Sequence, residues 1–301
     1  LEKVTRLGEL ATAIAHHPLL KDALALKGGT AFNLCFGTAP ARLSVDLDYN
    51  YIGHVEREAM LADRPRIEEA VVAVVQRLGF DVQQSADSFA GRKLYAGYRS
   101  VLGPPSRVEV DLNYLWRVPL HGVTERELWQ PGELDRPRVL TVSILELCVG
   151  KLLAFMDRSA ARDAWDVERM PTLTQEILWT PLFRALFIAL SVTLPHPLSN
   201  YKRKHIEERL TTRMIQEQLL PMLAVGRRLD KEELIERAWR VVAPSVELTP
   251  NEQEYIKLIN DGIIRPELLF PDQHAFAQRI AGHPAILWKV ANVLQERKKR
   301  G

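Results

Sequence analysis

A glycine turn, a short helix and an alternating strand follow one another between Lys27 and Tyr49. Gly28 and Gly29 come after a short apolar run, and a turn without Cβ atoms can present its backbone N–H groups to an anion at the start of the next helix. Thr30 is expected to cap that helix. The turn therefore predicts a phosphate-binding site.

The strand expected at residues 43–49 alternates with a period of two. Its apolar members, Leu43, Val45 and Leu47, are expected to face a core. Ser44, Asp46 and Asp48 then share the opposite face. Two carboxylates one strand repeat apart suit Mg²⁺, a hard cation that takes a few carboxylates and leaves other positions to triphosphate oxygens. An isolated Gly-Gly turn or Asp-x-Asp strand means little, and it is the order and close spacing of the two that indicate a function.

With 301 residues the chain has room for two compact units, and 47% hydrophobic residues are enough for buried cores. The net charge of +2 says little about partners because it hides how the charges are distributed. Charged residues interrupt every apolar run before the ~18 residues that a membrane span needs, and the N-terminus shows no signal pattern. We therefore expect a cytoplasmic protein with no membrane partner.

The first part of the chain mixes helical and strand patterns. Helices are expected at residues 4–16, 31–36 and 66–78, and further strands at residues 93–101 and 107–116. Residues 116–138 carry several prolines and are expected to form a connection. From residue 141 on, the patterns are almost all helical, with capping boxes that begin at Ser143 and Thr249. These patterns predict two domains, 1–138 and 139–301.

The strand expected at 107–116 also alternates, which places Glu109 and Asp111 on its polar face. A second run of charged residues begins at Lys151, and Arg158 lies two helical turns further on. Arg162, Asp163 and Asp166 continue the run at helical spacings. This run is either a solvated stripe with intrahelical ion pairs, each worth tenths of a kcal/mol, or part of a functional site.

Gly-Gly-Thr followed closely by Asp-x-Asp resembles the signature of the DNA polymerase β-like nucleotidyltransferase superfamily. In those enzymes the glycine turn holds a triphosphate, the aspartates hold metal ions, and a neighbouring strand supplies a third carboxylate. The resemblance gives that third role to Asp111, with Glu109 as the alternative. It implies an α+β fold, in which a core of a small mixed sheet with flanking helices precedes a C-terminal helical domain.

The motifs also resemble those of AbiEii/AbiGii-type nucleotidyltransferase toxins. They occur in the order of that family at Lys27–Thr30, Arg42–Asp48, Val110–Leu112, Lys151–Ala154 and Arg162–Asp166. The resemblance covers about residues 20–170. It implies a toxin of a toxin–antitoxin or abortive-infection pair that transfers a nucleotide from an NTP to an RNA and releases pyrophosphate, with the 3′ end of tRNA as the expected acceptor.

The resemblance also implies roles for individual residues. Asp46, Asp48 and Asp111 would hold Mg²⁺ or Mn²⁺, and Lys151 would act in catalysis by offsetting triphosphate charge. The residues expected to bind the nucleotide are Lys27, Gly28, Gly29, Thr30, Arg158, Arg162, Asp163 and Asp166. A cognate antitoxin is the expected partner, and phosphorylation of Ser44 or Thr30 is a hypothesis for how it silences the toxin.

Other functions stay open from the sequence. A nucleotidyltransferase that modifies a small molecule or a protein hydroxyl would need the same donor site, although a basic run at residues 202–205 favours RNA. A nucleotide-binding interaction protein that has lost catalysis would have little reason to keep three carboxylates. An Asp-x-Asp glycosyltransferase would need more βαβ pattern than this chain has. The sequence does not identify the nucleotide.

Overall fold

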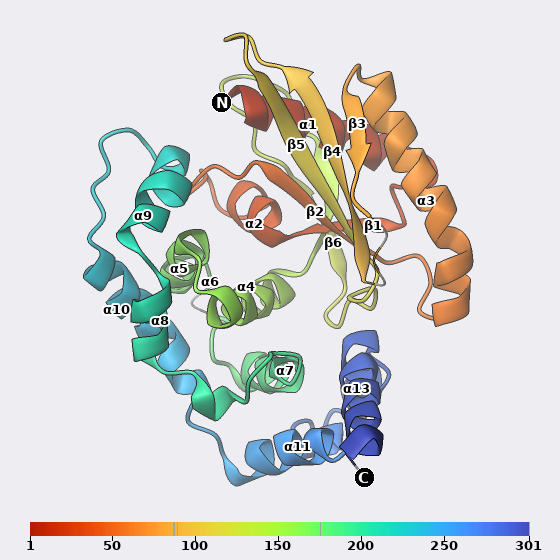
Figure 1. Ribbon diagram of the computed structural model, residues 1–301, viewed down its shortest axis with the longest axis vertical. Helices are drawn as coiled ribbons and strands as arrows, with labels where there is room; N and C mark the ends of the chain where they lie inside the picture. Colours follow the sequence, from red (N-terminus) through yellow and green to blue (C-terminus); the bar gives the residue numbers. More distant parts are fainter. Residues whose placement is uncertain (87, 89, 175, 301) are drawn as a thin grey trace. The chain divides into compact units, whose positions relative to one another are not determined.

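The computed structural model describes residues 1–86, 88, 90–174 and 176–300. The chain divides into two compact units, Leu1–Leu147 and Cys148–Gly301, which are coloured by sequence position in Figure 1. The division lies inside helix α4 (Ile144–Arg158), later than the boundary expected at residue 138. The reason is that residues 138–142 form a strand that pairs with the sheet of the first unit.

Within the described residues, the first unit is built on a seven-stranded sheet with the order β3-β4-β5-β2-β1-β7-β6. Its strands are β1 (Leu24–Lys27), β2 (Asp46–Tyr51), β3 (Asp81–Gln84), β4 (Gly91–Arg99), β5 (Pro105–Asn113), β6 (Val123–Glu127) and β7 (Arg138–Val142). β2 is parallel to β5 and β1 is parallel to β7, whereas the other neighbours are antiparallel. The expected mixed sheet of an α+β fold is confirmed.

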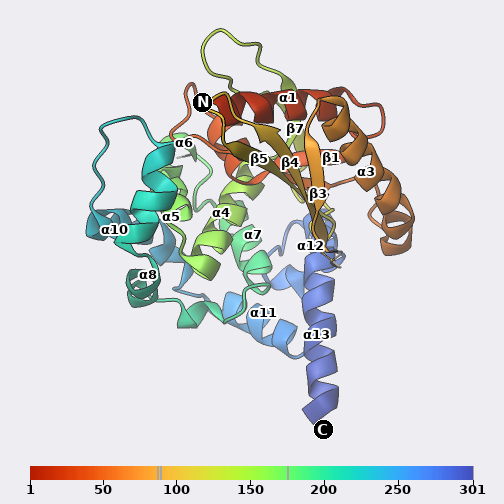
Figure 2. The same cartoon turned by 45° about the horizontal axis from the view of Figure 1, so that its top comes forward.

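Two helices, α1 (Glu2–His16) and α3 (Arg57–Arg77), accompany this sheet (Figures 1 and 2). α1 packs on β2, β5, β7 and α3, and α3 packs on β3. The helical stripe of α1 is buried as expected, because Leu7 and Leu10 have no exposed surface. Each such leucine contributes about 1.5–3 kcal/mol through burial.

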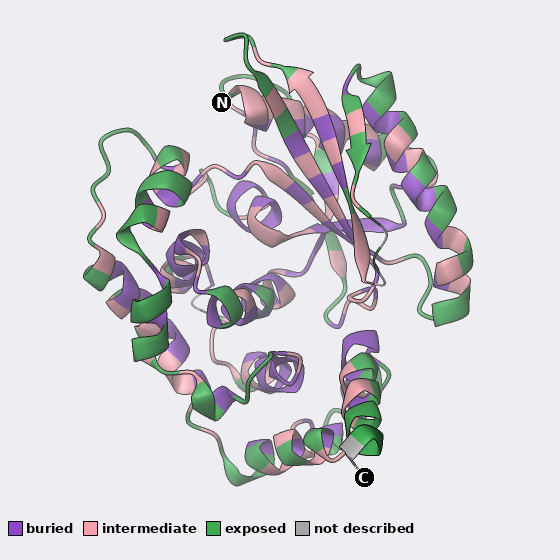
Figure 3. Cartoon of the chain, in the orientation of Figure 1, coloured by how far each residue is buried: buried purple, intermediate pink, exposed green. Residues whose placement is uncertain are grey.

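In the middle of β4 and β5, buried residues alternate with partly exposed ones (Figure 3). Val108, Val110 and Leu112 are fully buried. The intervening side chains of β5 therefore point to the other side of the sheet, together with Asp46 and Asp48 of β2. We call this side the polar face.

The helix expected at residues 66–78 begins earlier, at Arg57. Pro65 lies inside it, although proline removes one backbone donor and normally ends a helix. Tertiary contacts compensate, because the hydroxyl of Tyr51 donates to Asp63 at 2.8 Å and ties the first half of the helix to β2. The helix predicted from the apolar pattern begins after the proline and therefore lacks residues 57–65.

The strand expected at residues 43–49 begins only at Asp46. Ser44 is 3% exposed, whereas Leu43 and Val45 are only partly buried, so the predicted assignment of faces is wrong for these three residues. They lie outside the paired strand, where no pleat sets the directions of the side chains. The guanidinium of Arg42, which is itself buried, donates to the carbonyl of Leu43 at 2.9 Å.

Residues 116–138 are more than a connection, because they contain β6. This strand is mostly exposed and polar, so it shows no apolar alternation, and its pairing with β7 at the edge of the sheet defines it. The expected cap at Ser143 is present, since its hydroxyl accepts from the N–H of Glu146 at 3.3 Å. The Glu146 carboxylate in turn accepts backbone N–H groups from Leu120 and His121.

The second unit is helical, as expected. Its helices after α4 are α5 (Ala161–Glu168), α6 (Met170–Thr174), α7 (Pro181–Ser191), α8 (Arg203–Arg209), α9 (Thr212–Met214), α10 (Lys231–Val242), α11 (Pro250–Asn260), α12 (His274–Ala281) and α13 (Pro284–Arg300). The capping box at Thr249 and Glu252 is confirmed at the start of α11. Within the described part of the chain, none of the helices combines the length and the apolar composition that a membrane crossing needs.

Candidate active site

The glycine turn begins at the end of β1 and leads into helix α2 (Gly28–Thr30) and the π-helix η1 (Ala31–Cys35). Gly28 has φ +70°, in the left-handed region that favours glycine. A Cβ added to Gly28 would lie 2.1 Å from Oδ2 of Asp48. The turn and the Asp-x-Asp strand are therefore in direct contact, and the carboxylate of Asp48 occupies the space that a larger residue would fill.

Thr30 does not cap the helix. It is the last residue of α2 and directly precedes η1, but its side chain makes no capping hydrogen bond to either helix, and its hydroxyl donates to the backbone carbonyl of Asp46 instead. Thr30 is fully buried, so it links the glycine turn to β2 from inside the protein. The helix expected at residues 31–36 ends close to its predicted boundary, because η1 stops at Cys35 and Gly37 has φ +100°, which favours glycine after a helix.

Four acidic side chains form a block on the polar face. The parallel register of β2 and β5 pairs Asp46 with Glu109 and Asp48 with Asp111. Neighbouring strands lie about 4.8 Å apart, and successive residues on one face are separated by about 6.6 Å. The structure thus brings Asp111 next to Asp48, with Glu109 one step further along the strand.

Lys93 of β4 compensates part of this negative charge. Its Nζ pairs with Glu109 and lies 3.5 Å from Oδ2 of Asp111. Burial raises the pKa of Asp111 above its ordinary value, and the charge of Asp48 adds to this rise against the opposing effects of Lys93 and Lys27. Asp48 and Asp111 are therefore close enough to repel each other, and a cation between them would relieve that repulsion.

The donor set fits a hard divalent ion in chemistry, because carboxylate oxygens on two adjacent strands are the ligands that Mg²⁺ and Mn²⁺ take. Among the described residues, however, no three Asp, Glu, His or Cys side chains converge closely enough to hold one ion. The Asp111 carboxylate lies near Lys93 instead. Binding of an ion by all three aspartates would require Asp111 to exchange Lys93 for that ion.

The second group of predicted residues lies in the second unit. Nζ of Lys151 lies 2.7 Å from Oδ2 of Asp166 and 3.5 Å from Oδ1 of Asp163. The side chains of Lys151, Asp163 and Asp166 are 7%, 1% and 0% exposed. We call these three residues with Arg158 the Lys151 cluster.

Arg158 approaches the same carboxylate with two nitrogens, Nε at 2.6 Å and Nη2 at 3.1 Å from the oxygens of Asp163. Its side chain is 63% exposed. These ion pairs join two helices, because α4 ends at Arg158 and Ser159, with φ 51°, redirects the chain into α5. The interpretation as a solvated stripe with pairs inside one helix is therefore wrong. Arg162, on the first turn of α5, is partly exposed.

Lys93 was not among the residues predicted to form the site. Its signal was the alternation of the strand at residues 91–99, in which Lys93, Tyr95 and Gly97 share one side. Antiparallel pairing places Lys93 opposite Asp111 and Tyr95 opposite Glu109. Without that register, the sequence alone could not connect β4 to the carboxylates.

A mixed sheet that holds a glycine turn against an Asp-x-Asp strand, with a third carboxylate on the adjacent strand, is the arrangement expected of a nucleotidyltransferase. Residues 12–244 match the family described as "Nucleotidyl transferase AbiEii toxin, Type IV TA system". The match spans most of the chain, and the chain belongs to this family. It is a nucleotidyltransferase toxin of a type IV toxin–antitoxin system, which implies an NTP substrate and an antitoxin partner.

The fold is similar to that of MenT4, a nucleotidyltransferase toxin from Mycobacterium tuberculosis H37Rv, with a TM-score of 0.62. The alignment covers 95% of this chain and 92% of MenT4 at 17% sequence identity. This likeness confirms the fold class. No curated protein sequence matches the chain. The family match extends further toward the C-terminus than the motifs that the sequence analysis identified.

Proposed function

We propose that this protein transfers a nucleoside monophosphate from an NTP to the 3′ end of an RNA, with tRNA as the preferred acceptor. The observation that carries this proposal is the register of β2 and β5, which sets Asp48 beside Asp111 while Gly28 lies against the Asp48 carboxylate. A triphosphate held at the glycine turn would have its α-phosphorus beside the carboxylates. This arrangement suits an in-line displacement by an acceptor hydroxyl.

In the transfer, the acceptor oxygen forms a bond to the α-phosphorus while the bond to the bridging oxygen of pyrophosphate breaks. Asp46, Asp48 and Asp111 would hold Mg²⁺ or Mn²⁺, which supplies Lewis-acid stabilisation of the phosphates and lowers the pKa of the acceptor hydroxyl. Asp111 would also act as the general base that accepts the proton of that hydroxyl.

Lys27, Gly28 and Gly29 would hold the β- and γ-phosphates through one ammonium group and backbone N–H groups. The contribution of Thr30 is to position β2, since its hydroxyl already donates to Asp46. The Lys151 cluster would offset triphosphate charge through Lys151, while its two aspartates orient the cations. Arg158, the exposed member of the cluster, and Arg162 on α5 would add phosphate contacts.

The test is to incubate the purified protein with each α-labelled NTP, Mg²⁺ and total cellular RNA. We expect one nucleotide to label RNA at the 3′ end, and the label should be lost on treatment with ribonuclease. Label in a protein or a small molecule instead would favour the alternative acceptor classes. NTP binding without any transfer would favour a nucleotide-binding interaction protein.

For control by the antitoxin, our hypothesis remains phosphorylation of Ser44 or Thr30. A phosphate would bring a charge of about −1.5 to −2 next to the carboxylates and would compete for the same cations. Both side chains are buried, so the modification requires the segment around the glycine turn to open first. Intact mass and peptide mapping of toxin silenced by co-expression with its antitoxin provide the test. Absence of a species heavier by about 80 Da would favour direct binding of the antitoxin.

A further inference from the structure

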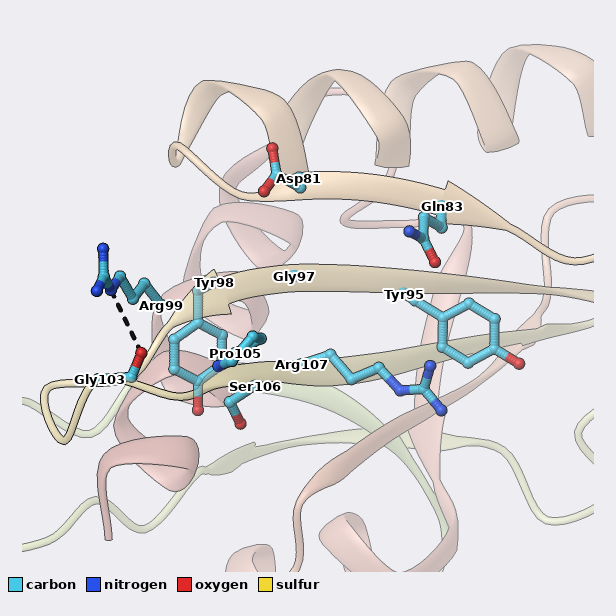
Figure 4. Close-up of a pocket in the computed structure, with 10 residues that line it drawn as sticks. All are labelled: Asp81, Gln83, Tyr95, Gly97, Tyr98, Arg99, Gly103, Pro105, Ser106 and Arg107. Atoms are coloured by element: carbon cyan, nitrogen blue, oxygen red, sulfur yellow. Dashed lines mark hydrogen bonds between the residues drawn. The ribbon is translucent and has the colours of Figure 1, made fainter.

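The polar face continues past the carboxylates into a hollow of about 760 Å³ over strands β3, β4 and β5. Figure 4 shows this hollow with the residues that line it. Its polar-face members are Asp81, Gln83, Tyr95, Gly97, Arg99 and Arg107. We call this surface the β4–β5 platform, and all of it lies in the first unit.

Strand register connects the platform to the candidate active site. Tyr95 pairs with Glu109, and the next pair along the same side is Lys93 with Asp111. One strand across and two residues along place the Cα atoms of Tyr95 and Asp111 about 8 Å apart. The platform therefore begins one step from the candidate metal ligands, on the same face of the sheet.

The strand order separates the platform from the glycine turn. The turn follows β1, the carboxylates lie on β2 and β5, and the platform lies on β3, β4 and β5. A donor triphosphate at Gly28 and a second substrate on the platform would thus approach the carboxylates from opposite sides. That is the arrangement that a transfer between two substrates requires.

The chemistry of the platform suits a nucleic acid strand. The guanidinium of Arg107 lies 4.5 Å from the ring centroid of Tyr95, and Figure 4 shows its side chain extending toward that ring. Tyr95 is only partly buried although Arg107 lies over its ring, so a base would stack on the exposed part of this Tyr95–Arg107 pair. Aromatic rings and guanidinium planes on an open sheet are surfaces on which unpaired bases stack, while cations contact the phosphates.

Gly97 lines the hollow and has no side chain, so it leaves space between the neighbouring lining residues. Across the strands it pairs with Arg107 on one side and Asp81 on the other. A Cβ at Gly97 would come no closer than 3.5 Å to Asp81, which is an ordinary contact, and its φ is not in the left-handed region. A side chain could therefore be tolerated by the fold, and it would fill the hollow.

We propose that the β4–β5 platform binds the single-stranded 3′ segment of the RNA acceptor, with a base stacked on Tyr95 and phosphates near Arg99 and Arg107. This inference rests on the proposed function, because it assigns a binding surface to the acceptor of that reaction. The short distance to Asp111 places the stacked base close to the reacting end. Two arginines against one aspartate give the lining a positive balance, which complements the RNA backbone.

The test measures binding of a 5′-fluorescein-labelled, unstructured oligoribonucleotide to the full-length protein by anisotropy, without NTP. Tyr95→Ala should weaken binding by about tenfold or more, which corresponds to the loss of one base–aromatic stack. Tyr95→Phe should retain the affinity because it keeps the ring. Gly97→Val should weaken binding by filling the hollow. Arg66→Ala, which removes an exposed arginine of α3 outside the platform, is the matched control and should bind like the wild type.

Failure of the wild type to bind the oligoribonucleotide would overturn the inference, and so would affinities of Tyr95→Ala and Gly97→Val within twofold of wild type. If Tyr95→Ala fails to fold by circular dichroism, Gly97→Val and Arg107→Ala decide the outcome. A wild type that labels RNA while the platform variants keep their affinity would leave the proposed function standing and remove the platform. If the protein labels no RNA but its binding to the oligoribonucleotide depends on Tyr95, the platform stands as a binding surface and the proposed function is removed.

Discussion

The acidic block on the polar face and the Lys151 cluster both combine aspartates with a lysine, yet their environments are opposite. The side chains of Asp111 and Lys93 are 31% and 45% exposed, whereas those of Asp166 and Lys151 are almost completely buried. The Lys93 ammonium group can therefore leave the carboxylates of the block for solvent, so that another cation can take its place. In the Lys151 cluster only Arg158 is exposed, so the proposed contact of Lys151 with a triphosphate requires its buried ion pairs with Asp163 and Asp166 to open first.

This difference indicates that the acidic block acts mainly in activity and the Lys151 cluster mainly in stability. The block has an excess of negative charge on an accessible face, which is the condition for taking up a metal ion or presenting a carboxylate to a substrate. In the Lys151 cluster, opposite charges neutralise each other at short distance, and removing one partner would leave the other buried and unpaired. Substitutions in the block should thus lower the transfer activity, whereas substitutions in the cluster should lower the free energy of unfolding.

The largest effect should come from Asp46→Asn. The amide keeps the shape of the side chain but loses the charge expected to hold the metal, so transfer should fall on the order of 10³-fold. The midpoint of thermal unfolding should stay near that of the wild type. Addition of a chelator to the wild type should cause the same loss, with recovery on addition of Mg²⁺. Equal labelling by mutant and wild type would remove Asp46 from the metal site.

Asp166→Ala should have the largest effect on stability, because it leaves the Lys151 ammonium buried beside a single, more distant carboxylate. Loss of one partner of a buried ion pair typically costs about 3–5 kcal/mol. Urea unfolding followed by circular dichroism measures this cost. Asp111→Asn is the control from the acidic block and should shift the midpoint little. Similar midpoints for the two variants would contradict the contrast between the regions.

Gly28→Ala tests the contact between the turn and Asp48. The left-handed φ of Gly28 costs a residue with a Cβ about 1–2 kcal/mol, and the new methyl group must also displace the Asp48 carboxylate. We expect transfer to fall by more than about tenfold, as for a misplaced catalytic group. Gly103→Ala is the matched control, since Gly103 has φ +97° and an added Cβ there meets nothing within 4 Å. If both variants transfer equally well, the turn does not position Asp48.

Lys93→Ala should have the smallest effect on stability, below about 1 kcal/mol, because exposed ion pairs contribute little. It should also lower the Mg²⁺ concentration needed for half-maximal transfer, since Asp111 would no longer have to exchange Lys93 for the ion. Titration of Mg²⁺ against initial rates measures this shift. If the variant instead needs more Mg²⁺, Lys93 would hold the Asp111 carboxylate in position for the metal ion.

Local patterns predicted much of the fold. The stripe of α1, the alternation of β5, the side-chain cap at Ser143 and the capping box at Thr249 are each set by residues within a few positions of one another. Errors occurred where distant contacts outweigh such patterns. Pro65 is held inside α3 by a neighbouring strand, and the exposed residues of β6 form a strand only because β7 lies beside them.

The sequence by itself determined the types and order of the chemical groups: a glycine turn, an Asp-x-Asp strand, a carboxylate on a further strand and a charged run with helical spacing. Only the tertiary structure decided which of them meet. The parallel pairing of β2 with β5 sets Asp48 beside Asp111, and the break at Ser159 folds two aspartates back onto Lys151. The physical reason is that strand register and the direction of a chain after a helix depend on packing between distant segments, which local spacing cannot encode.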